Sequence, residues 1–427
     1  MKNHVLLLIA LFFFSCILPA CRQSTDESNT ESDSHDTATP DDEGAKATAT
    51  SAAGTKGTES GRLPKFDVLS KDELAEGWIR LFDGETLFGW EASTNANWHI
   101  ENGTITADQG ERGLLCTTVD FADYVLRVDF KAHPQSNSGI FLRTPLKSSD
   151  PKTNCYELNI APDDNAYPTG SLVFRRKVHG NNSEEWQTFE ATVLGNEITI
   201  RLNGEQIVHY VDKSPLSKGR IGLQLNEGHI AFRNIFLKPL SLKPLFDGKT
   251  LDGWKTYPDM DSEFSVTDEG LLHVENGRGQ LETTESYGDF VLQLECRTNA
   301  PYLNSGIFFR CIPGELMNGY ESQIQNQFKK DRRDPVDCGT GGIFRRVNAR
   351  FVAADDDTWF SKTIVASGPR FGVWVNGVQV TAWTDDREED ENPRRGLRTK
   401  PGTIMIQGHD PTTDIDFRNL RIVPLPE

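Results

Sequence analysis

The segment GYESQIQN carries long polar side chains at every second position. Because side chains alternate between the two faces of a β-strand, Glu321, Gln323 and Gln325 fall on one face, and Tyr320 and Ser322 fall on the other. Three long polar groups on one face are typical of a groove that binds a polar ligand. The alternative is a solvated strand face, which antiparallel sheets commonly have.

Two further segments place charged and amide groups by the same alternation. In GTIMIQGHD, Gln407 and His409 share one face, and in SGIFFR the side chain of Arg310 lies opposite two apolar residues. If these strands belong to one concave sheet, all three side chains converge with Glu321 and Gln323 in a single groove. Histidine and glutamate exchange protons and arginine stabilises negative charge, so the set could act on sugar hydroxyls and a carbonyl.

The elements that must position these groups occur twice in the chain. LFDGETLFGW begins at position 81 and LFDGKTLDGW at position 245, and the separation of 164 positions is about the size of one domain. Further segments match in the same order, among them NSGIFLR with NSGIFFR, CYELNI with GYESQI, TGSLVFRR with TGGIFRR, and IRLNGEQIV with VWVNGVQVT. The chain is therefore expected to hold two copies of one domain, at residues 71–240 and 243–427.

Both copies have the sequence pattern of an all-β fold. Most matched segments are short runs rich in β-branched and aromatic residues, bounded by Gly, Asn, Asp or Pro. The Asn203-Gly204 and Asn376-Gly377 pairs predict two-residue hairpin turns. About ten to twelve strands per copy exceed what one small sheet holds, so each copy is expected to be a sandwich of two packed sheets.

The repeated decapeptide itself is predicted to have a structural role. Its Asp-Gly pairs, which begin at Asp83 and Asp247, are typical turn dipeptides. Trp90 and Trp254 at its end are expected in the hydrophobic core, and stacking on a sugar ring is the alternative. Trp383, next to the polar TDDR segment, is the better candidate for sugar stacking.

The N-terminal segment has the pattern of an export signal that ends in a lipidation site. A positive start precedes the apolar run VLLLIALFFFSCIL, which is too short for a spanning helix, and LPAC resembles a bacterial lipobox. Residues 1–21 are therefore predicted to be a signal peptide, with Cys21 lipidated; plain secretion with cleavage nearby is the alternative. Residues 22–70 are predicted to form a disordered tether. Arg22 favours an outer-membrane anchor in a bacterial cell envelope, facing the periplasm or the exterior.

Composition limits the partners. The 427 residues carry a net charge of −18 without a dense Lys/Arg stripe, which argues against nucleic acid as a partner. Contact with a membrane is expected only through the lipid at Cys21. The five later cysteines form no CxxC pair or Cys/His cluster, so a zinc site is unsupported. Cys311 and Cys338 could form a disulfide, and buried free thiols are the alternative.

The matched motifs resemble those of one known family. LFDGxTLxGW, NSGIFFR, GYESQIQ, GGIFRR, WVNGVQVTAWTDDR and IMIQGHDPTTDIDFRNLRI occur in an order similar to that of the bacterial 3-keto-disaccharide hydrolases. The resemblance covers residues 243–425 strongly and residues 77–240 weakly. It implies two tandem concanavalin A-like jelly-roll β-sandwiches, and cleavage of glycosides that are already oxidised to a ketone at carbon 3.

The resemblance also implies roles for the groove residues. A ketone at carbon 3 acidifies the hydrogen at carbon 2, so a base can remove it, the glycosidic oxygen leaves, and water adds back. His409 or Glu321 is expected as base and proton donor, and Arg310, aided by Arg345, as stabiliser of the enolate. No redox cofactor is required. A divalent metal could be bound instead by Glu321 and His409, where it would polarise the ketone.

The other groove residues are expected to bind the 3-keto-sugar or glycan substrate. In the second copy these are Gln323, Gln325, Gln407, Arg345 and Trp383, and in the first copy Arg143, Glu157 and Gln224. The first copy has Asn226 where the second has His409, and Asn159 in place of Gln323. It is therefore expected to be a sugar-holding partner domain, or an active variant with different selectivity.

Two functions remain open from the sequence. The first is an envelope enzyme that cleaves 3-keto-glycosides by elimination and hydration, with its active site in the second copy. The second is a lectin-like lipoprotein that binds glycans without turning them over. Jelly-roll sandwiches host both activities, so the fold alone cannot separate them.

Overall fold

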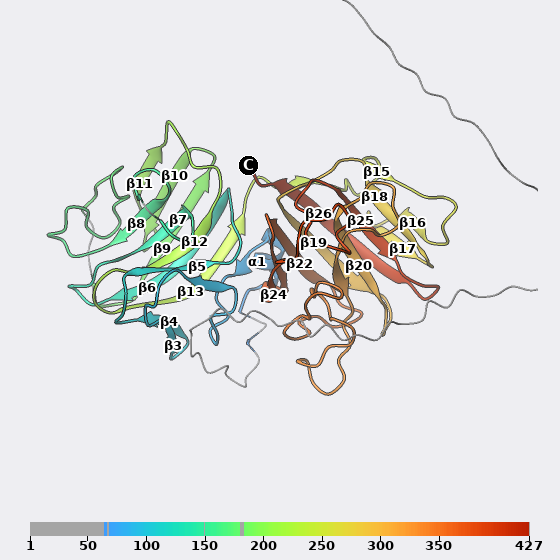
Figure 1. Cartoon of the computed structure of the whole chain (residues 1–427), viewed down its shortest axis with the longest axis horizontal. Helices are drawn as coiled ribbons and strands as arrows, with labels where there is room; N and C mark the ends of the chain where they lie inside the picture. Colours follow the sequence, from blue (N-terminus) through green and yellow to red (C-terminus); the bar gives the residue numbers. More distant parts are fainter. Residues whose placement is uncertain (1–63, 66–67, 149, 180–182, 427) are drawn as a thin grey trace, which may run out of the picture. The chain divides into compact units, whose positions relative to one another are not determined.

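The computed structural model describes residues 64–65, 68–148, 150–179 and 183–426 (Figure 1). All of these residues belong to one compact unit. The predicted signal peptide, the lipidation site at Cys21, and residues 22–63 and 66–67 of the predicted tether lie outside the described residues. Within the described part of the chain, no helix is long and apolar enough to cross a membrane.

The first copy forms two antiparallel sheets that share a hydrophobic core. The larger sheet has the strand order β11 (Glu205–Val211), β10 (Glu197–Leu202), β9 (Gln187–Leu194), β6 (Tyr124–Ala132), β13 (Ile230–Pro239), β4 (Thr104–Ala107) and β3 (His99–Glu101), with β1 (Ile79–Arg80) paired to β13. The smaller sheet has the order β2 (Trp90–Ala92), β5 (Gly113–Thr117), β12 (Arg220–Leu225), β7 (Ser138–Thr144) and β8 (Tyr156–Ile160).

The second copy repeats this arrangement. Its larger sheet has the order β16 (Glu263–Val266), β17 (Leu272–Glu275), β26 (Asp414–Pro424), β19 (Phe290–Thr298), β22 (Phe360–Ser367), β23 (Arg370–Val375) and β24 (Val378–Thr384), with β14 (Lys243–Pro244) paired to β26. Its smaller sheet has the order β15 (Trp254–Lys255), β18 (Gly279–Thr283), β25 (Thr403–Gly408), β20 (Ser305–Cys311) and β21 (Tyr320–Ile324). The predicted all-β fold of two tandem jelly-roll sandwiches is therefore confirmed.

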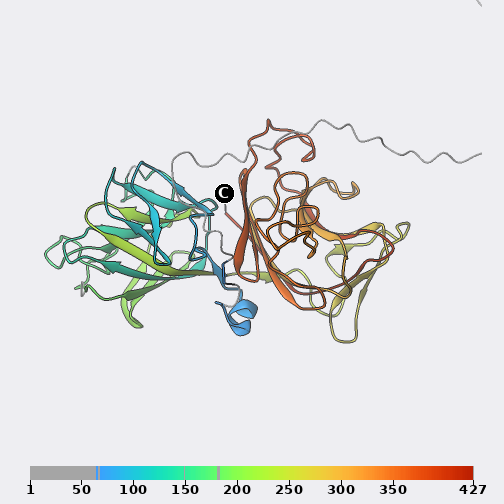
Figure 2. The same cartoon turned by 90° about the horizontal axis from the view of Figure 1, so that it is seen from below.

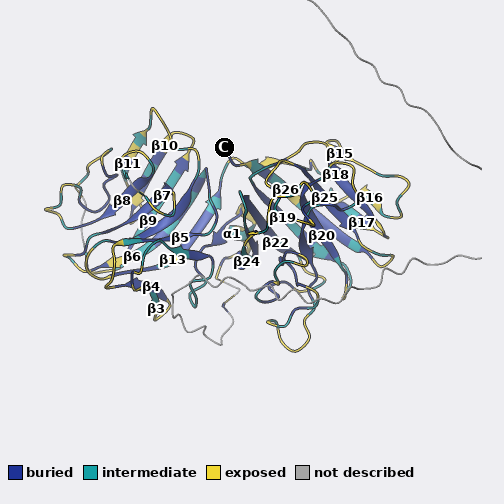
Figure 3. Ribbon diagram, viewed as in Figure 1, coloured by how far each residue is buried: buried dark blue, intermediate teal, exposed yellow. Residues whose placement is uncertain are grey.

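Residue alternation accounts for the two layers of each copy. In β6, fully buried residues alternate with partly exposed ones, so one face packs into the core while the other meets solvent. Figure 3 shows the buried strands in dark blue and the exposed loops in yellow. The strand pattern gave no sign of the one helix in the described residues, α1 (Lys71–Glu76), which is blue in Figure 2. A reciprocal capping box between Ser70 and Glu73 begins this helix.

The smaller sheet of the second copy is unusual because both of its faces are buried. Every residue of β20, β21 and β25 is buried. One face contributes Ile307, Phe309 and Tyr320 to the hydrophobic core. The opposite face carries Glu321 and Gln407 beneath the loops that follow these strands, and this polar, covered face contains the candidate site.

The structural role predicted for the repeated decapeptide is confirmed. The indole N–H of Trp90 donates a 2.7 Å hydrogen bond to the carbonyl of Leu81, and Trp254 does the same to Leu245 at 2.8 Å. Both tryptophans are buried, and Asp83 accepts hydrogen bonds from two backbone N–H groups of its turn. Each decapeptide thus closes on itself and packs into its sandwich.

Both predicted Asn-Gly hairpin turns are present. Asn203 and Gly204, with φ of 51° and 86°, join β10 to β11. Asn376 and Gly377, with φ of 49° and 73°, join β23 to β24. Positive φ at both central positions is what a type I′ turn requires.

All five cysteines of the described residues are free and buried, so the suggested pairing of Cys311 with Cys338 is absent. Cys311 packs in a small apolar cluster with Phe308, Met317 and Met405. Burial raises the pKa of the Cys338 thiol to about 12. These thiols therefore act as small apolar groups, which was the alternative considered for them.

Side chains of the two sandwiches contact each other. Arg350 forms a 2.9 Å ion pair with Asp83 of the first decapeptide. The indole N–H of Trp374 donates a 2.8 Å hydrogen bond to the carbonyl of Arg80, and this tryptophan belongs to the core cluster of the first sandwich. The first decapeptide thereby also serves as a docking point for the second copy.

Candidate active site

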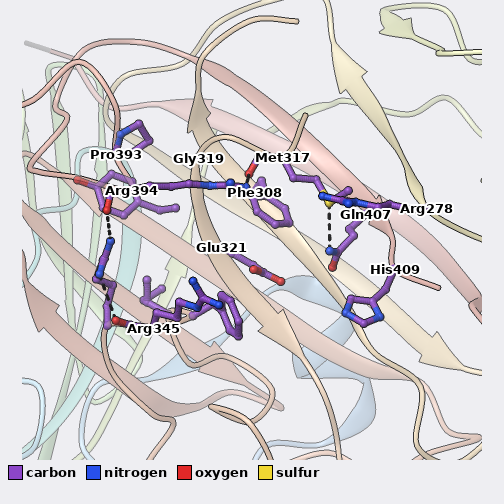
Figure 4. Close-up of a pocket in the computed structure, with 14 residues that line it drawn as sticks. Arg278, Phe308, Met317, Gly319, Glu321, Arg345, Pro393, Arg394, Gln407 and His409 are labelled. Carbon is purple, nitrogen blue, oxygen red and sulfur yellow. Dashed lines mark hydrogen bonds between the residues drawn. The ribbon is translucent and has the colours of Figure 1, made fainter. Parts of the chain in front are cut away.

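A pocket of about 560 Å³ lies over the smaller sheet of the second sandwich (Figure 4). Three neighbouring strands of this sheet contribute Glu321 from the edge strand β21, Phe308 from β20 and Gln407 from β25. Three loops and the strand ends supply the rest: Arg278, Met317, Gly319, Tyr320, Ile343, Phe344, Arg345, Arg346, Pro393, Arg394 and His409. The pocket therefore combines one carboxylate, one imidazole, one amide and four guanidinium groups.

Glu321 is the buried acid of this pocket. Its side chain is 9% exposed, and no described residue donates a hydrogen bond to its carboxylate. Burial raises the pKa of Glu321 to about 7, and the nearby positive charges of Lys362 and Arg394 partly oppose this rise. A carboxylate with a pKa near neutrality and no internal partner is suited to accept a proton from a ligand.

A glycine on the neighbouring strand makes room for this carboxylate. Gly306 of β20 pairs directly with Gln323 of β21. A Cβ atom at position 306 would lie only 2.5 Å from Oε1 of Glu321. The glycine of the NSG motif therefore has a steric reason, because any side chain there would displace the acid.

Lys362 lies behind this strand and was not singled out in the sequence. It is 1% exposed, and its Nζ donates 2.8 Å hydrogen bonds to the carbonyls of Ser322 and Gln323. It belongs to β22 of the larger sheet, so its side chain crosses the sandwich core to reach β21. Burial lowers the pKa of Lys362 to about 7. The first sandwich has Phe189 at the matching position. Phe189 pairs with Val128 of β6, as Lys362 pairs with Leu294 of β19.

His409 lies directly after β25 at the pocket edge. Its Nδ1 lies 2.7 Å from Oδ2 of Asp410, and Asp410 also accepts a hydrogen bond from the backbone N–H of Thr412. Because a carboxylate only accepts hydrogen bonds, this contact assigns the proton of the neutral ring to Nδ1 and leaves Nε2 as the basic atom. In the view of Figure 4, Glu321 lies between His409 on one side and Arg345 and Arg394 on the other.

Gln407 supplies an oriented amide beside these groups. Its Nε2 donates to the sulfur of Met317 at 3.1 Å, while its buried Oε1 has no hydrogen-bond partner in the described chain. Buried polar atoms are normally paired with protein, water or ligand. The carbonyl oxygen of Gln407 is therefore available to a ligand hydroxyl.

The structure brings together four of the predicted site residues and separates four others from them. Glu321, Gln407, His409 and Arg345 line the pocket, as the alternation of the strands and the loop motif suggested. Arg310, Gln323, Gln325 and Trp383 do not line it.

The placement predicted for Arg310 is wrong. Its side chain is fully buried, forms a 2.7 Å ion pair with Asp289, and donates to the carbonyls of Gly288, Gly368 and Arg398. The register of β20 shifts between Phe308 and Cys311, and Arg310 has a φ of 49°. This bulge interrupts the alternation, so the guanidinium enters the core side instead of the groove.

Three further predicted residues contact other protein groups outside the pocket. These residues are Gln323, Gln325 and Trp383. Gln323 donates to Asn304 at 2.7 Å, and both glutamines lie where the segment after residue 338 hydrogen-bonds along β21. Trp383 stacks on Phe371 with ring centroids 5.4 Å apart. The segment after residue 338 covers that end of β21, and the tryptophan packs against the hydrophobic core.

The first sandwich keeps only part of this constellation. Burial raises the pKa of Glu157 to about 7, and the neighbouring side chain of Gln224 partly opposes this rise. Strand register places Asn226 where His409 lies, as predicted. Phe174 takes the place of Arg345. Each residue lies two positions after a β-bridge residue that is matched between the copies, Leu172 in the first and Ile343 in the second, and the two φ angles are similar, at 61° and 58°.

Arg143 repeats the structural role of Arg310. It pairs with Asp123 at 2.9 Å and donates to the carbonyls of Ala122 and Gly195. A pocket of about 580 Å³ in the first sandwich is lined by Phe174 and Arg175 but not by Glu157 or Gln224. The first copy thus retains the acid and the amide but has neither the imidazole nor a counterpart of Arg345.

The donors that could hold a divalent metal are few. The described residues contain no group of three or more His, Cys, Asp or Glu side chains placed to bind one ion. Glu321 and His409 are the two ionisable donors of the pocket, and the four arginines oppose a further positive charge. This donor set does not fit a resident metal held by protein ligands, and no step below is routed through one.

Sequence reasoning missed several pocket residues. Arg394 and Arg346 come from the loops that follow β24 and β21, where no strand period exists to place a side chain. Arg278 could have been found, because Arg-Gly precedes the matched strand in both copies, at Arg112 and Arg278. Lys362 stands in an alternating strand at a position that the pattern assigns to the core, where a lysine is exceptional.

Known proteins and protein families show similarity to both copies. The domain family described as "3-keto-alpha-glucoside-1,2-lyase-like domain" matches residues 77–238 and residues 241–423. A 3-keto-disaccharide hydrolase from Bacteroides thetaiotaomicron is 24% identical over 247 residues, covering 43% of this chain and 85% of the relative.

Solved structures are similar to parts of the chain. A candidate glycosyl hydrolase from Parabacteroides distasonis is 21% identical, with 41% of this chain and 99% of that chain covered and a TM-score of 0.37. The carbohydrate-binding module CBM66 from Bacillus subtilis is 15% identical, with 35% and 95% covered and a TM-score of 0.28.

Proposed function

The chain belongs to the 3-keto-alpha-glucoside-1,2-lyase-like family, of which it contains two tandem copies, and we propose that it cleaves 3-keto-glycosides at an active site in the second sandwich. The observation that carries this proposal is the buried carboxylate of Glu321, with its pKa raised to about 7, in a pocket that also contains His409 and Arg345. The first sandwich, which lacks the imidazole, would hold sugar without cleaving it.

The first step is removal of a proton. The ketone at carbon 3 acidifies the hydrogen at carbon 2, and Glu321 removes this proton. Its burial and its raised pKa make the carboxylate a stronger base than an exposed one. The electron pair of the broken bond forms an enolate. Arg345 stabilises the enolate oxygen, since its charge is one of those that act on Glu321, and it takes the role that the sequence assigned to Arg310.

The second step is loss of the leaving group. The enolate re-forms the ketone and expels the glycosidic oxygen from carbon 1, which leaves a double bond between carbons 1 and 2. His409 enters this step with both ring nitrogens protonated and passes the proton on Nε2 to the departing oxygen, while Asp410 accepts the hydrogen bond of Nδ1. Gln407 accepts a hydrogen bond from a sugar hydroxyl and orients the ring.

The third step is hydration. Water adds its oxygen to carbon 1, its proton passes to His409, and protonated Glu321 returns its proton to carbon 2. Both side chains are then back in their starting states, and the net reaction is hydrolysis of the glycosidic bond. No redox cofactor enters the balance, because the oxidation at carbon 3 precedes this reaction.

The family membership and the relative's activity support a sugar substrate, while the lipid anchor rests on the sequence pattern at Cys21 alone. We extend the proposal to an enzyme that is anchored in a bacterial envelope through this cysteine. Nucleic acid is not expected as a partner, because the net charge is −18.

The experiment compares a 3-keto-glycoside with its unoxidised parent in heavy water. The purified protein should release the leaving group from the ketone alone, and the recovered sugar should carry deuterium at carbon 2 to the extent that the proton held by Glu321 exchanges with solvent before hydration. Equal cleavage of both compounds would contradict the elimination route. Binding of the sugars without any cleavage would favour the lectin-like alternative.

A further inference from the structure

Arg278 is a pocket residue to which the reaction above gives no role. It directly precedes β18, whose first residue, Gly279, pairs with Gly408 of β25, so Arg278 lies at the end of the sheet that also bears His409. Figure 4 shows it on the same side of the pocket as Gln407 and His409. Its guanidinium is exposed and makes no hydrogen bond or ion pair with another described residue.

The first sandwich shows what an arginine at this position does when no ligand needs it. Arg112 precedes Gly113 of β5, which pairs with β12 as Gly279 pairs with β25. Arg112 forms an exposed ion pair of 3.9 Å with Glu227, the residue after Asn226. The arginine of the first copy is therefore neutralised by a carboxylate at the end of the sheet.

In the second copy the matching carboxylate belongs to Asp410, and it contacts His409 instead of the arginine. Asp410 follows His409 as Glu227 follows Asn226, but its carboxylate contacts Nδ1 of His409 at 2.7 Å. The second copy thus has a histidine, His409, in place of Asn226, and, within the described residues, its arginine, Arg278, has no ion pair like that of Arg112. Arg278 is left with its charge facing the pocket.

The other arginines of the pocket also form no ion pair with a carboxylate of the described residues. Arg394 donates to the carbonyl of Met317, and Arg346 donates to the carbonyls of Arg345 and Arg394. Arg345 lies over the ring of Phe344 and forms no ion pair with a described residue. A pocket with four guanidinium groups and one carboxylate is conspicuous in a chain of net charge −18, because general surface composition would favour acidic groups.

We propose that the substrate of this pocket carries an acidic group, a carboxylate or a sulfate ester on a sugar unit, and that Arg278 binds it. This inference rests on the proposed function and names its substrate class. Arg278 directly precedes β18, and Glu321 belongs to β21, with β25 and β20 between these two strands in the sheet. Its contact would therefore lie away from the proton-transfer group and serve selectivity. A guanidinium can bind the two oxygens of a carboxylate or a sulfate ester through two parallel hydrogen bonds.

Binding to unoxidised sugars tests the inference without any turnover. Titration calorimetry at low salt would compare methyl glucoside, methyl glucuronide and methyl glucoside 6-sulfate on the purified protein, on Arg278→Gln and on Arg112→Gln. We expect an acidic ligand to bind roughly tenfold more tightly than the neutral sugar, as one charge-assisted pair allows. Arg278→Gln should lose this preference, and Arg112→Gln should keep it. A preference for only one of the two acidic sugars would identify which anion the site takes.

The outcomes separate this inference from the proposed function. Equal affinity for neutral and acidic sugars, or a preference that survives Arg278→Gln, would overturn the anion site even if 3-keto-glycosides are cleaved. If no 3-keto-glycoside is cleaved but acidic sugars still bind through Arg278, the proposed reaction fails and the anion site stands. Arg278 is exposed and unpartnered, so its substitution should leave the melting temperature unchanged, which a thermal scan would verify.

Discussion

Lys362 approaches Glu321 from the opposite sheet of the second sandwich. Its buried Nζ donates 2.8 Å hydrogen bonds to the carbonyls of the two residues that follow Glu321 on β21. The charge of Lys362 is also the largest influence that opposes the rise in the pKa of Glu321. The core of this sandwich thus contains a positive group that tunes the acid of the pocket without reaching the pocket itself.

Removal of Lys362 should shift the pH dependence of cleavage. Lys362→Met removes a positive charge near Glu321, so the pKa of the carboxyl should rise above its present value of about 7. The acid limb of kcat/KM should therefore move to higher pH, by about one pH unit. Phe189→Met, the change at the matching position of the first sandwich, is the control and should leave the profile in place. An acid limb that does not move would show that Lys362 has only a structural role.

Substitution of the acid should abolish cleavage while binding persists. Glu321→Gln keeps the shape of the side chain but cannot accept the proton from carbon 2, so turnover should fall by roughly 10²- to 10⁴-fold. The matched variant Glu157→Gln in the first sandwich should keep most of its activity. Turnover assays on a 3-keto-glycoside would measure both. Comparable losses in the two variants would place cleavage in both sandwiches.

The same variant has a predicted stability effect. Glu321 has a pKa of about 7 in the folded protein against an ordinary value of 4.5, so the folded state holds the proton more tightly. Its contribution to the free energy of unfolding is fully present below pH 4.5 and is lost as pH rises through about 7, by on the order of 3 kcal/mol. Glu321→Gln does not titrate, so its gain in melting temperature over the parent should be larger at pH 8 than at pH 4.5. An equal difference at both pH values would argue against a buried, neutral acid.

Arg310 should prove essential to folding rather than to chemistry. Arg310→Met removes the buried partner of Asp289, which keeps its ion pair with Lys218, and leaves the carbonyls of Gly288, Gly368 and Arg398 without their donor, so we expect a loss of about 1–3 kcal/mol. Arg143→Met should have a similar effect in the first sandwich, since it makes the equivalent contacts. Chemical denaturation would measure both. A strong loss of turnover in Arg310→Met at unchanged stability would restore the enolate role that the sequence suggested.

A chelator should leave cleavage intact. Proton transfer by Glu321 and His409, with Arg345 at the enolate, needs no metal, and the pocket offers only those two ionisable donors. Turnover after dialysis against EDTA should therefore equal that of the untreated protein. Loss of activity that added divalent metal restores would mean that substrate or water oxygens complete a metal site with these two residues.

Much of the fold followed from the sequence because strand alternation and turn dipeptides act locally. The Asn-Gly turns at Asn203 and Asn376 and the buried tryptophans of the decapeptides were all predictable from a few neighbouring residues. The helix before the first sandwich was not, because its six residues contain only a capping box as a signal.

The candidate site was predictable only where local alternation held. Glu321 and Gln407 belong to regular strands and line the pocket on the predicted face. Arg310 follows a bulge, which no alternation rule anticipates, and it enters the core. The roles of Lys362, Arg346 and Arg394 depend on contacts between segments far apart in sequence, so a single sequence could not assign them.

The most direct test of the account is turnover of a 3-keto-glycoside chromogen by the purified protein, by His409→Ala and by Asn226→Ala. The second variant changes the corresponding position of the first sandwich. We expect His409→Ala to lose at least about a hundredfold in kcat while it still binds the sugar, because the leaving oxygen no longer receives a proton. Asn226→Ala should cleave the chromogen like the parent protein. Undiminished turnover in His409→Ala, or binding without turnover in the parent, would contradict an active site in the second sandwich.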